Sequence, residues 1–501
     1  MVIGEIQMIS TDILEIGSRR ELFVDYYLVD SMDNVELKLH EPRDEGVALQ
    51  LDQPWESPYA CYFTVFKEED RYRMYYRGLN DPSSGGGGHS ASTCYAESSD
   101  GIVWERPQLG LVEINGSYDN NAITTGSNYG SSIAIDENRQ PNSNYFSVTM
   151  DTRPGVDPSE RFKALSGSPP SAFVSEDGIH WNRLTQKPVM SHDKPAWDSQ
   201  NVAFWSESEG CYVAYVREWK LLGNTLEESS LEYRKRFGKD GHGLRWISRT
   251  TSDDFVNWTP LVQMDCGDTP DEQLYTNGTH PYFRAPHIYI SLAKRFMEGR
   301  QALPDEQAEQ LFADGVVKYY SDSSDSVFMT SRGGNRYDRT FMEGFIRPGP
   351  SPRDWINRDN TPALGVVPGG DRDMYIYRLS QYGQPTVHLS RYSIRLDGFI
   401  SVNADYSGGE FVTKPFKFKG NKLEINYATS AAGGIQVEIL NQEGFPIAGY
   451  RLEECPEFFG DEIDRVVEWK NGPDVGILEG KVVRLRFYMK DADLYSIKFT
   501  D

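Results

Sequence analysis

The chain repeats one short pattern three times, as Ser99–Trp104 (SDGIVW), Glu176–Trp181 (EDGIHW) and Asp253–Trp258 (DDFVNW). The tryptophans of successive copies are separated by 77 residues in both intervals, and a weaker fourth copy, Ser331–Tyr337, follows after a further 79. Equal spacing of this kind is the signature of a repeat architecture in which each copy is one structural unit. In each copy, the acidic residue and glycine favour a tight turn after a strand, and the aromatic residue covers apolar surface beside it.

Strand-like runs surround these copies and predict five β-hairpins, each followed by a third strand. The hairpins are Tyr62–Phe66 with Tyr72–Arg77, Tyr145–Met150 with Arg161–Leu165, Val202–Trp205 with Cys211–Arg217, Tyr282–Phe283 with His287–Leu292, and Leu364–Val367 with Met374–Leu379. The composition agrees, because 13% aromatic residues with 45 Gly and 27 Pro favour many short strands joined by turns. The sequence therefore predicts an all-β fold whose main part is a five-bladed β-propeller.

The pattern of strand-like runs changes near Ser407. From there, strands such as Lys422–Tyr427 and Val482–Tyr488 follow one another without the repeated turn. A chain of 501 residues is expected to form more than one domain. We predict an N-terminal extension over 1–19, a propeller that carries the active site over 20–404, and a C-terminal β-sandwich over 405–501.

The charge of the chain excludes several classes of partner. Lys and Arg total 51 against 75 Asp and Glu, which gives a formal net charge of −24 and disfavours binding to nucleic acid or to an anionic membrane. No run of about 18 apolar residues occurs. The expected location is the cytoplasm, or the periplasm or exterior if a leader has been removed.

The ligand-type residues form no metal motif. Five scattered cysteines include no Cys-x-x-Cys pair, and the eight histidines include no His-Glu-x-x-His. We expect no metal and no cofactor, although bound calcium would leave no such pattern.

A five-bladed propeller followed by a β-sandwich resembles glycoside hydrolase family 32, and the blades resemble families 43, 68, 117 and 130. The segments Glu21–Asp25, Glu272–Asn277, Phe345–Gly349 and Lys490–Tyr495 also resemble bacterial proteins described as family-32-like. The family 32 signature Trp-Met-Asn-Asp-Pro-Asn-Gly and its Arg-Asp-Pro and Glu-Cys motifs are absent from the sequence. The resemblance thus implies the fold and glycoside hydrolysis more than it implies a fructose-type substrate.

Such propellers are expected to carry their catalytic acids at the start of the innermost strand of each blade. Hydrolysis of a glycosidic bond needs one carboxyl group as proton donor and a second, ionised one as nucleophile or base. Asp198 precedes the third blade's hairpin and is the first choice, with a turn-capping role as its alternative. Glu272 and His280 flank a polar run ahead of the fourth blade; His280 would share or replace the acid role, as the resemblance to family 117 implies, or be structural.

Two further carboxylates are candidates. Glu56 precedes the first blade's hairpin. Asp25 lies in an otherwise apolar run, where a buried acid has to be paired or has its pKa moved. The alternative for Asp25 is strand alternation with the carboxylate facing solvent.

Basic, amide and aromatic side chains are the candidates for binding substrate. Arg332 and Arg358 belong to an arginine-rich segment, and an arginine fork binds a carboxylate or sulfate with two hydrogen bonds. Pairing with nearby acidic residues is the alternative and is slightly favoured. The remaining candidates are Asn201, Tyr275, Asn277, Trp197 and Trp55, with packing in the core as the alternative for the aromatic residues.

The sequence therefore predicts a glycosidase, exo-acting, that removes a terminal sugar from an oligosaccharide or polysaccharide, the sugar being neutral, acidic, sulfated or an anhydro sugar. Two alternatives stay open: a carbohydrate-binding propeller without catalysis, and a glycoside phosphorylase that uses inorganic phosphate. Sugar identity, stereochemical outcome and assembly as a homo-oligomer are not determined by the sequence.

Overall fold

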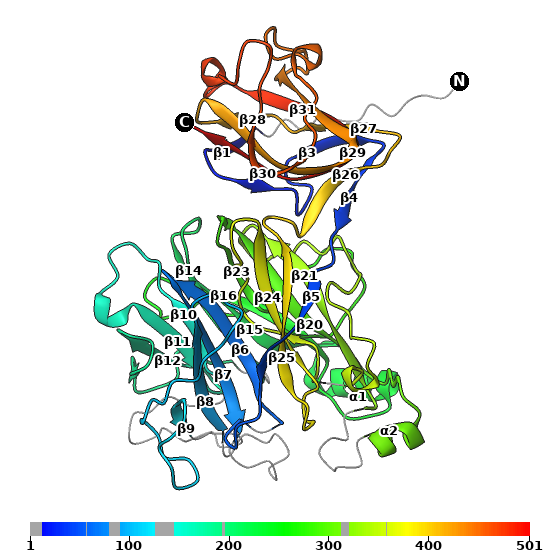
Figure 1. Cartoon of the computed structure of the whole chain (residues 1–501). Coiled ribbons are helices and arrows are strands. Elements are labelled where there is room, and N and C mark those ends of the chain that lie inside the picture. Colours follow the sequence, from blue (N-terminus) through cyan, green and yellow to red (C-terminus); the bar gives the residue numbers. More distant parts are fainter. Residues whose placement is uncertain are drawn as a thin grey trace. The chain divides into compact units, whose positions relative to one another are not determined.

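The computed structural model describes residues 13–56, 58–79, 91–125, 145–192, 196–311, 320–356 and 358–501. These residues divide into two compact units (Figure 1). One unit runs from Pro42 to Ile394, and the other combines the segment that ends at Glu41 with Arg395–Asp501.

The unit from Pro42 to Ile394 is the predicted propeller: its described residues form five antiparallel sheets, which confirms the five-bladed fold. The first three blades are β6–β9 (Cys61–Glu68, Arg71–Leu79, Ala91–Ser98, Ala122–Thr125), β10–β13 (Ser147–Met150, Phe162–Ser166, Ser171–Ser175, Asn182–Arg183) and β14–β17 (Val202–Ser206, Cys211–Lys220, Leu244–Ser252, Val262–Gln263). The fourth blade is β18–β21 (Leu274–Thr276, Thr279–Tyr282, Ala285–Met297, Ser323–Ser331). The fifth combines β22–β25 (Thr361–Pro362, Val367–Pro368, Asp373–Ser380, His388–Arg395) with β5 (Arg43–Gln50).

The ring is closed by β5, which pairs antiparallel with β25 at the far end of the propeller sequence. The propeller therefore begins at Pro42 and not at residue 20, where the sequence placed its start. The reason is that β1–β4 (Leu14–Gly17, Glu21–Leu22, Val29–Asp33, Val35–Leu39) pair with strands near the C-terminus instead.

The second unit is a ten-stranded mixed sheet built from both ends of the chain. Its C-terminal strands are β26–β31 (Ile400–Ala404, Gly409–Thr413, Phe416–Phe418, Lys422–Asn441, Asp461–Val466, Val483–Thr500). The parallel pairing of β1 with β28 makes the sheet mixed. The sequence had suggested that residues 405–501 form a domain by themselves. They do not, because the N-terminal strands complete their sheet.

The repeated turn joins neighbouring blades. Asp177 Oδ1 accepts hydrogen bonds from the backbone N–H of Ile179 and of His180, both at 2.8 Å. The carbonyl of Asp177 in turn accepts from Arg73, which lies on β7 of the preceding blade, at 2.7 Å. In the first blade, the carbonyl of Gly101 accepts from Tyr377 on β24 of the fifth blade. The repeat that revealed the fold is therefore also a contact between adjacent blades.

The innermost strand of the fourth blade is interrupted, which gives its two halves different neighbours. Gly278 separates β18 from β19 with φ +55°, and a Cβ there would lie 2.6 Å from the carbonyl oxygen of Leu292. Only glycine fits this left-handed position. The fifth blade is interrupted in the same way between β22 and β23.

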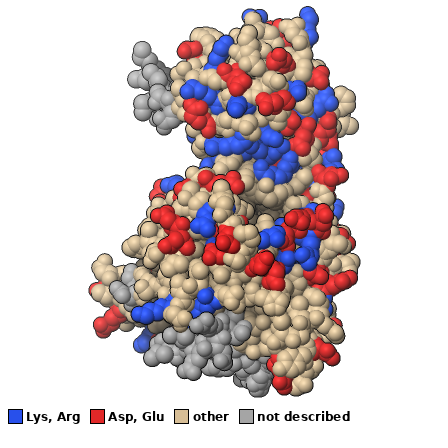
Figure 2. Space-filling view, turned by 90° about the vertical axis from the view of Figure 1, so that its left-hand side faces the viewer, with Lys and Arg blue, Asp and Glu red and all other residues tan. Residues whose placement is uncertain are grey.

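Two short helices, α1 (Leu226–Phe237) and α2 (Asp305–Leu311), lie in the connections between β15 and β16 and between β20 and β21. Among the helices of the described residues, none is long and apolar enough to cross a membrane. On the face of the propeller in Figure 2, Lys and Arg lie interspersed with Asp and Glu, so the surface charge there is mixed and not segregated.

Candidate functional site

A small polar pocket of about 50 Å³ lies where the innermost strands of all five blades begin. Its lining residues are Cys61, Tyr62, Arg77, Tyr145, Asp198, Tyr275, Lys294, Arg358, Thr361 and Tyr382. Each blade contributes at least one residue that lies at or just before the beginning of its innermost strand. This is the position at which the sequence predicted the catalytic groups, and Asp198, Tyr275 and Arg358 of the predicted residues are brought together here.

The backbone is left-handed at the same places. Tyr62 (φ +58°), Tyr145 (φ +62°) and Arg358 (φ +69°) line the pocket, and Trp197 (φ +75°) precedes Asp198. Residues other than glycine rarely adopt such angles, and bulky ones do so at a cost. Backbone strain of this kind gathers at functional sites, where the surrounding fold holds it in place.

Asp198 is oriented by groups from two blades. Tyr145 donates its phenol hydrogen to Oδ1 at 2.7 Å, and Arg217 Nη1 lies 3.1 Å from Oδ2. The side chain is still 48% exposed, whereas that of Arg217 is buried. Asp198 thus presents a fixed, half-exposed carboxylate that lines the pocket and keeps lone pairs the protein does not occupy.

Three cations surround the rest of the pocket: Arg77 from β7, Lys294 from β20 and Arg358 ahead of β22. Arg77 donates to the carbonyl of Tyr59 at 3.1 Å and lies over the ring of Tyr62, 5.1 Å from its centroid. Among the described lining residues, Asp198 is the single carboxylate. In a chain of net charge −24, this pocket is locally positive.

Lys294 is the most unusual group in the pocket. Its side chain is buried, its Nζ lies 5.1 Å from the centroid of the Tyr275 ring, and this Nζ makes no hydrogen bond or ion pair with any described residue. Burial, together with the nearby charge of Arg358, lowers the pKa of Lys294 to about 7. A buried ammonium without an anion partner is costly, and the lowered pKa reduces that cost by favouring the neutral amine.

A second, larger cavity of about 460 Å³ lies at the other ends of the innermost strands and is mostly apolar, with Phe66, Met150, Phe204 and Val366 among its lining residues. His280 lines this cavity and not the polar pocket. Its Nε2 accepts a hydrogen bond from the backbone N–H of Val366 at 3.0 Å, so the other nitrogen, Nδ1, carries the hydrogen and donates to the carbonyl of Gly278 at 2.9 Å. Burial lowers the pKa of His280 to about 4, so the imidazole is a neutral link between two blades.

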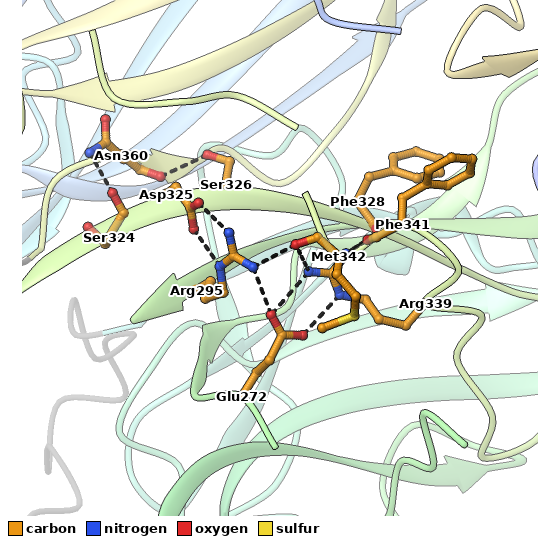
Figure 3. A network of polar contacts seen from close by, with 10 residues as sticks. All are labelled: Glu272, Arg295, Ser324, Asp325, Ser326, Phe328, Arg339, Phe341, Met342 and Asn360. Carbon is orange, nitrogen blue, oxygen red and sulfur yellow. Dashed lines mark hydrogen bonds and ion pairs between the residues drawn. The ribbon is translucent and has the colours of Figure 1, made fainter. Parts of the chain in front are cut away.

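Glu272 lies in a network of ion pairs (Figure 3) and lines neither of the two cavities. Arg339 binds it through Nε to Oε2 at 3.0 Å and Nη2 to Oε1 at 3.1 Å, and Arg295 reaches Oε1 at 3.0 Å. Arg295 also pairs with Asp325. Both oxygens of Glu272 are occupied by guanidinium groups, which is the arrangement of a structural ion pair.

Glu56 is fully buried and is bound on both oxygens by Arg106, at 2.7 and 3.0 Å. Burial raises its pKa, although Arg106 opposes that effect, and Tyr76 donates to Oε1 at 2.5 Å. Asp25 belongs to the ten-stranded sheet unit, where Oδ1 accepts from the backbone N–H of Tyr27 at 3.0 Å. Neither carboxylate lines the polar pocket or the larger apolar cavity.

The remaining predicted binding residues do not line the polar pocket. They either hold the turn that carries Asp198 or lie elsewhere. Asn201 donates to the carbonyls of Trp197 and Ser199, and so shapes the turn that carries Asp198. Trp197 is buried in a hydrophobic cluster. Asn277 accepts from the backbone N–H of Thr279 and donates to the carbonyl of Tyr215.

Two predicted residues lie outside both linings. Trp55 donates through Nε1 to Asn121 at 2.6 Å, and Arg332 follows the end of β21.

Sequence reasoning missed Arg77 and Lys294, because it searched only the starts of the innermost strands, and both lie on the second strand of their blade. One signal was present. Lys294 directly follows the largely apolar run Ile288–Ala293 of a central strand, where a lysine side chain has little solvent to face. In the described part of the chain, no group of three or more His, Cys, Asp or Glu side chains is arranged to hold a metal ion.

The comparison with known proteins finds solved structures that are similar to this chain. No family model matches the chain, and no curated protein matches it. A solved structure described as a glycoside hydrolase is 13% identical with a TM-score of 0.42, covering 71% of this chain and 92% of that one. A Bacillus subtilis glycoside hydrolase family 43 arabinoxylan arabinofuranohydrolase, solved with cellotetraose, is 12% identical with a TM-score of 0.39, covering 89% and 96%.

A third solved structure, from a study of the family 130 mannoside phosphorylases and their relatives that hydrolyse β-1,2-mannosidic linkages of Candida mannan, is 14% identical with a TM-score of 0.39, covering 74% of this chain and 96% of that chain. These likenesses concern the fold. The resemblance to family 32 stays a prediction.

Proposed function

We propose that the protein cleaves a glycosidic bond of an oligosaccharide or polysaccharide at the polar pocket, with Asp198 acting on the terminal sugar. The observation that carries this proposal is the position of Asp198. It is a half-exposed carboxylate at the point where five innermost strands begin, and Tyr145 and Arg217 fix its orientation. A carboxylate held in this way is suited to act as nucleophile or as general base toward the anomeric carbon.

The strained backbone around the pocket supports the same site. Each left-handed residue costs on the order of 1–3 kcal/mol, and four of them lie in or beside the polar pocket, at Tyr62, Tyr145, Trp197 and Arg358. The repeat alone does not require this conformation, since a turn residue such as glycine would adopt it without strain. The side chains kept at these positions therefore favour a role in binding or catalysis.

In hydrolysis, a water oxygen bonds to the anomeric carbon while the bond to the leaving oxygen breaks. In a one-step reaction, Asp198 accepts the proton of the attacking water. In a two-step reaction, Asp198 instead attacks the anomeric carbon and is later displaced by water, whose proton goes to the group that first acted as acid. In both reactions that acid donates a proton to the leaving oxygen. Among the described lining residues, no second carboxyl group is present for that donation. The proton donor is then a different type of group or comes from another part of the chain.

The lack of a second carboxyl group among the described lining residues favours one alternative function, cleavage by inorganic phosphate. There a phosphate oxygen attacks the anomeric carbon, the bond to the leaving oxygen breaks, and the leaving oxygen takes a proton from Asp198, which would enter as the acid. One carboxyl group and a cationic pocket suffice for this reaction, and the pocket has Arg77, Lys294 and Arg358.

Product release by the purified protein tests both functions. Neutral, carboxylated and sulfated oligosaccharides are incubated with the protein, with and without inorganic phosphate, beside Asp198→Asn. We expect a free monosaccharide without phosphate, and a loss of at least about 100-fold in rate for Asp198→Asn. A sugar phosphate that forms only with added phosphate would establish the alternative.

The matched control is Asp271→Asn. Asp271 is a similarly exposed carboxylate, at 41%, that pairs with Lys220 outside the pocket lining. Its replacement should leave the rate unchanged. Equal activity of Asp198→Asn and the wild type would reject the assignment, and saturable glycan binding without any product would indicate a carbohydrate-binding propeller.

A further inference from the structure

The hydrolysis proposed above needs a proton donor besides Asp198, and the polar pocket limits which groups can fill that role. A poor leaving group departs only when its oxygen takes up a proton. The arginines of the lining do not give up a proton. Besides Asp198, the described lining side chains that carry a dissociable proton are one thiol, four phenols and one amine: Cys61, Tyr62, Tyr145, Tyr275, Tyr382 and Lys294.

Four of these six groups are poor donors or are already engaged. Burial raises the pKa of Cys61 and of Tyr62, and it raises that of Tyr382 to about 12. Protons held this tightly are donated poorly near neutral pH. Tyr145 already donates its phenol hydrogen to Asp198 Oδ1 at 2.7 Å. One phenol and the amine of Lys294 remain.

Lys294 is held in the lining by the strand that carries it. β20 is a central strand of the fourth blade, and on it Lys294 pairs with Thr276 of β18 and with Ser326 of β21. Pairing on both sides fixes the backbone from which the side chain starts. The side chain is buried, and its Nζ makes no hydrogen bond or ion pair with any described residue. The amine is therefore positioned at the pocket without a described acceptor for its protons.

One aromatic ring lies beside both Lys294 and the group that orients Asp198. Nζ of Lys294 is 5.1 Å from the centroid of the Tyr275 ring, and the guanidinium carbon of Arg217 is 5.3 Å from the same centroid. Arg217 in turn binds Asp198 at 3.1 Å. The carboxylate and the amine thus line one pocket from neighbouring blades, so a substrate bound there can contact both.

From this arrangement we propose that Lys294 is the proton donor of the cleavage reaction, its ammonium group protonating the leaving oxygen while Asp198 acts as base or nucleophile. This inference rests on the proposed function, because it assigns the second role of the same reaction. In the one-step reaction, an N–H bond of Lys294 breaks as the O–H bond of the leaving group forms, and Asp198 takes the proton of the water; exchange with solvent restores both groups. In the two-step reaction, neutral Lys294 takes the proton of the water that displaces Asp198 and becomes an ammonium again.

The surroundings of Lys294 suit this role near neutral pH. Burial, and after it the charge of Arg358, lowers the pKa of Lys294 to about 7, and an acid works best when its pKa lies near the operating pH. Burial also raises the pKa of Asp359 to about 7, and its ionised form favours the ammonium. The charged and titratable groups around Lys294 are Arg358, Asp359, Cys61, Arg245 and Tyr275, together with Arg77, Asp198, Tyr62, Tyr145 and Tyr382 of the same lining. The rate should fall as the pH rises above 7, because the neutral amine is not an acid.

Two substrates that differ only in the leaving group test the assignment on the full chain. They are the methyl glycoside and the 2,4-dinitrophenyl glycoside of the sugar that the wild type releases from the oligosaccharide panel. Methanol needs a proton to leave, whereas 2,4-dinitrophenol leaves as a stable anion. Lys294→Met should lower kcat/KM at least about 100-fold on the methyl glycoside and less than about fivefold on the dinitrophenyl glycoside. In the wild type, kcat/KM should fall about tenfold for each pH unit above about 7 on the methyl glycoside only.

Three further variants separate proton donation from other roles. Lys294→Arg keeps the positive charge but cannot give up a proton, so it should show the same dependence on the leaving group, and it serves if Lys294→Met fails to fold. Tyr275→Phe removes the remaining phenol and should leave the ratio of the two rates unchanged. The control is Lys220→Met, because Lys220 also lies over an aromatic ring, 4.8 Å from the centroid of Trp246, but outside the lining. Both rates of this control should equal those of the wild type.

Equal losses of Lys294→Met on both substrates would overturn the inference, since they would make Lys294 a binding or structural group. A selective loss on the methyl glycoside in Tyr275→Phe alone would also overturn it. So would formation of a sugar phosphate only with added phosphate, because Asp198 is then the acid. Asp198-dependent hydrolysis that does not need Lys294 would keep the proposed function and reject this role, whereas the absence of any cleavage would reject both.

Discussion

Asp198 and Glu272 differ in how many of their lone pairs the protein itself occupies. Glu272 accepts three guanidinium hydrogen bonds and its side chain is 10% exposed. Asp198 accepts from one phenol and one guanidinium group and is 48% exposed. A carboxylate that has to bind or attack a substrate needs free lone pairs, so only Asp198 has the surroundings of a catalytic group.

Glu272→Gln is accordingly expected to affect stability and not catalysis. The amide keeps the shape of the side chain but removes the charge that Arg295 and Arg339 require, which should lower the free energy of unfolding by about 2 kcal/mol. The rate of product release should stay within about threefold of the wild type. Urea denaturation and initial rates measured on the same preparation check both parts. Lost turnover at unchanged stability would return Glu272 to the catalytic candidates.

His280 gives a stability that depends on pH. Its pKa is lowered to about 4 in the folded protein, against 6.5 in an unfolded chain. Between these values, the unfolded state binds a proton that the folded state does not. The free energy of unfolding should therefore fall as the pH decreases from 6.5 to 4, by up to about 3 kcal/mol from this residue.

His280→Gln isolates that effect, because the amide oxygen still accepts the hydrogen bond from Val366 without titrating. Urea denaturation at pH 7.5 and pH 4.5 should show a smaller loss for the variant than for the wild type. Equal losses would mean that His280 is not buried in its neutral form.

At the scale of the element, the repeated turn is the unit that shapes each blade and joins it to the next. In the third copy, Asp254 Oδ1 accepts from the backbone N–H of Val256 at 2.8 Å and of Asn257 at 2.7 Å. Phe255 takes the left-handed position, at φ +65°, where the other copies have glycine. Among the three copies that end in tryptophan, the aspartate is thus the common structural requirement, and the glycine is not.

Asp254→Ala should destabilise the protein by about 1 kcal/mol, since two backbone N–H groups of the turn lose their acceptor. Partial burial raises the pKa of Asp254, but the hydrogen bonds from Asn257 outweigh it and bring the pKa to about 2. Its contribution should therefore be complete above about pH 4 and be lost as the pH falls toward 2. Thermal unfolding at pH 7 and pH 3 measures this, with the neighbouring Asp253→Ala as control. Similar midpoints for the two variants would contradict this role.

At the scale of the whole molecule, the five blades were predictable because hairpin-like runs recur five times and four of them are followed by a copy of one local pattern. The closure of the ring was not, because Arg43–Gln50 has charges and a glycine in place of an apolar alternation, and its partner β25 lies at the other end of the propeller sequence. The place of Asp198 in the pocket lining was predictable from its position before an innermost strand. The cationic side of the pocket was not, because Arg77 and Lys294 meet it only once separate blades converge.

The sharing of one sheet by both ends of the chain leads to the last prediction. Strands β1–β4 pair with β26, β27, β28 and β31, so residues 395–501 depend on the N-terminal segment for complete hydrogen bonding. A chain that begins at Pro42 keeps the ring-closing strand β5 but leaves several edges of that sheet unpaired. Limited proteolysis should therefore cleave residues 395–501 at least tenfold faster in this truncated chain than in the full one, while the propeller fragment persists. A chain that begins at Ile13 retains every one of these strands and should be cleaved like the full chain. Equal protection of 395–501 in all three chains would show that the C-terminal strands fold without their N-terminal partners.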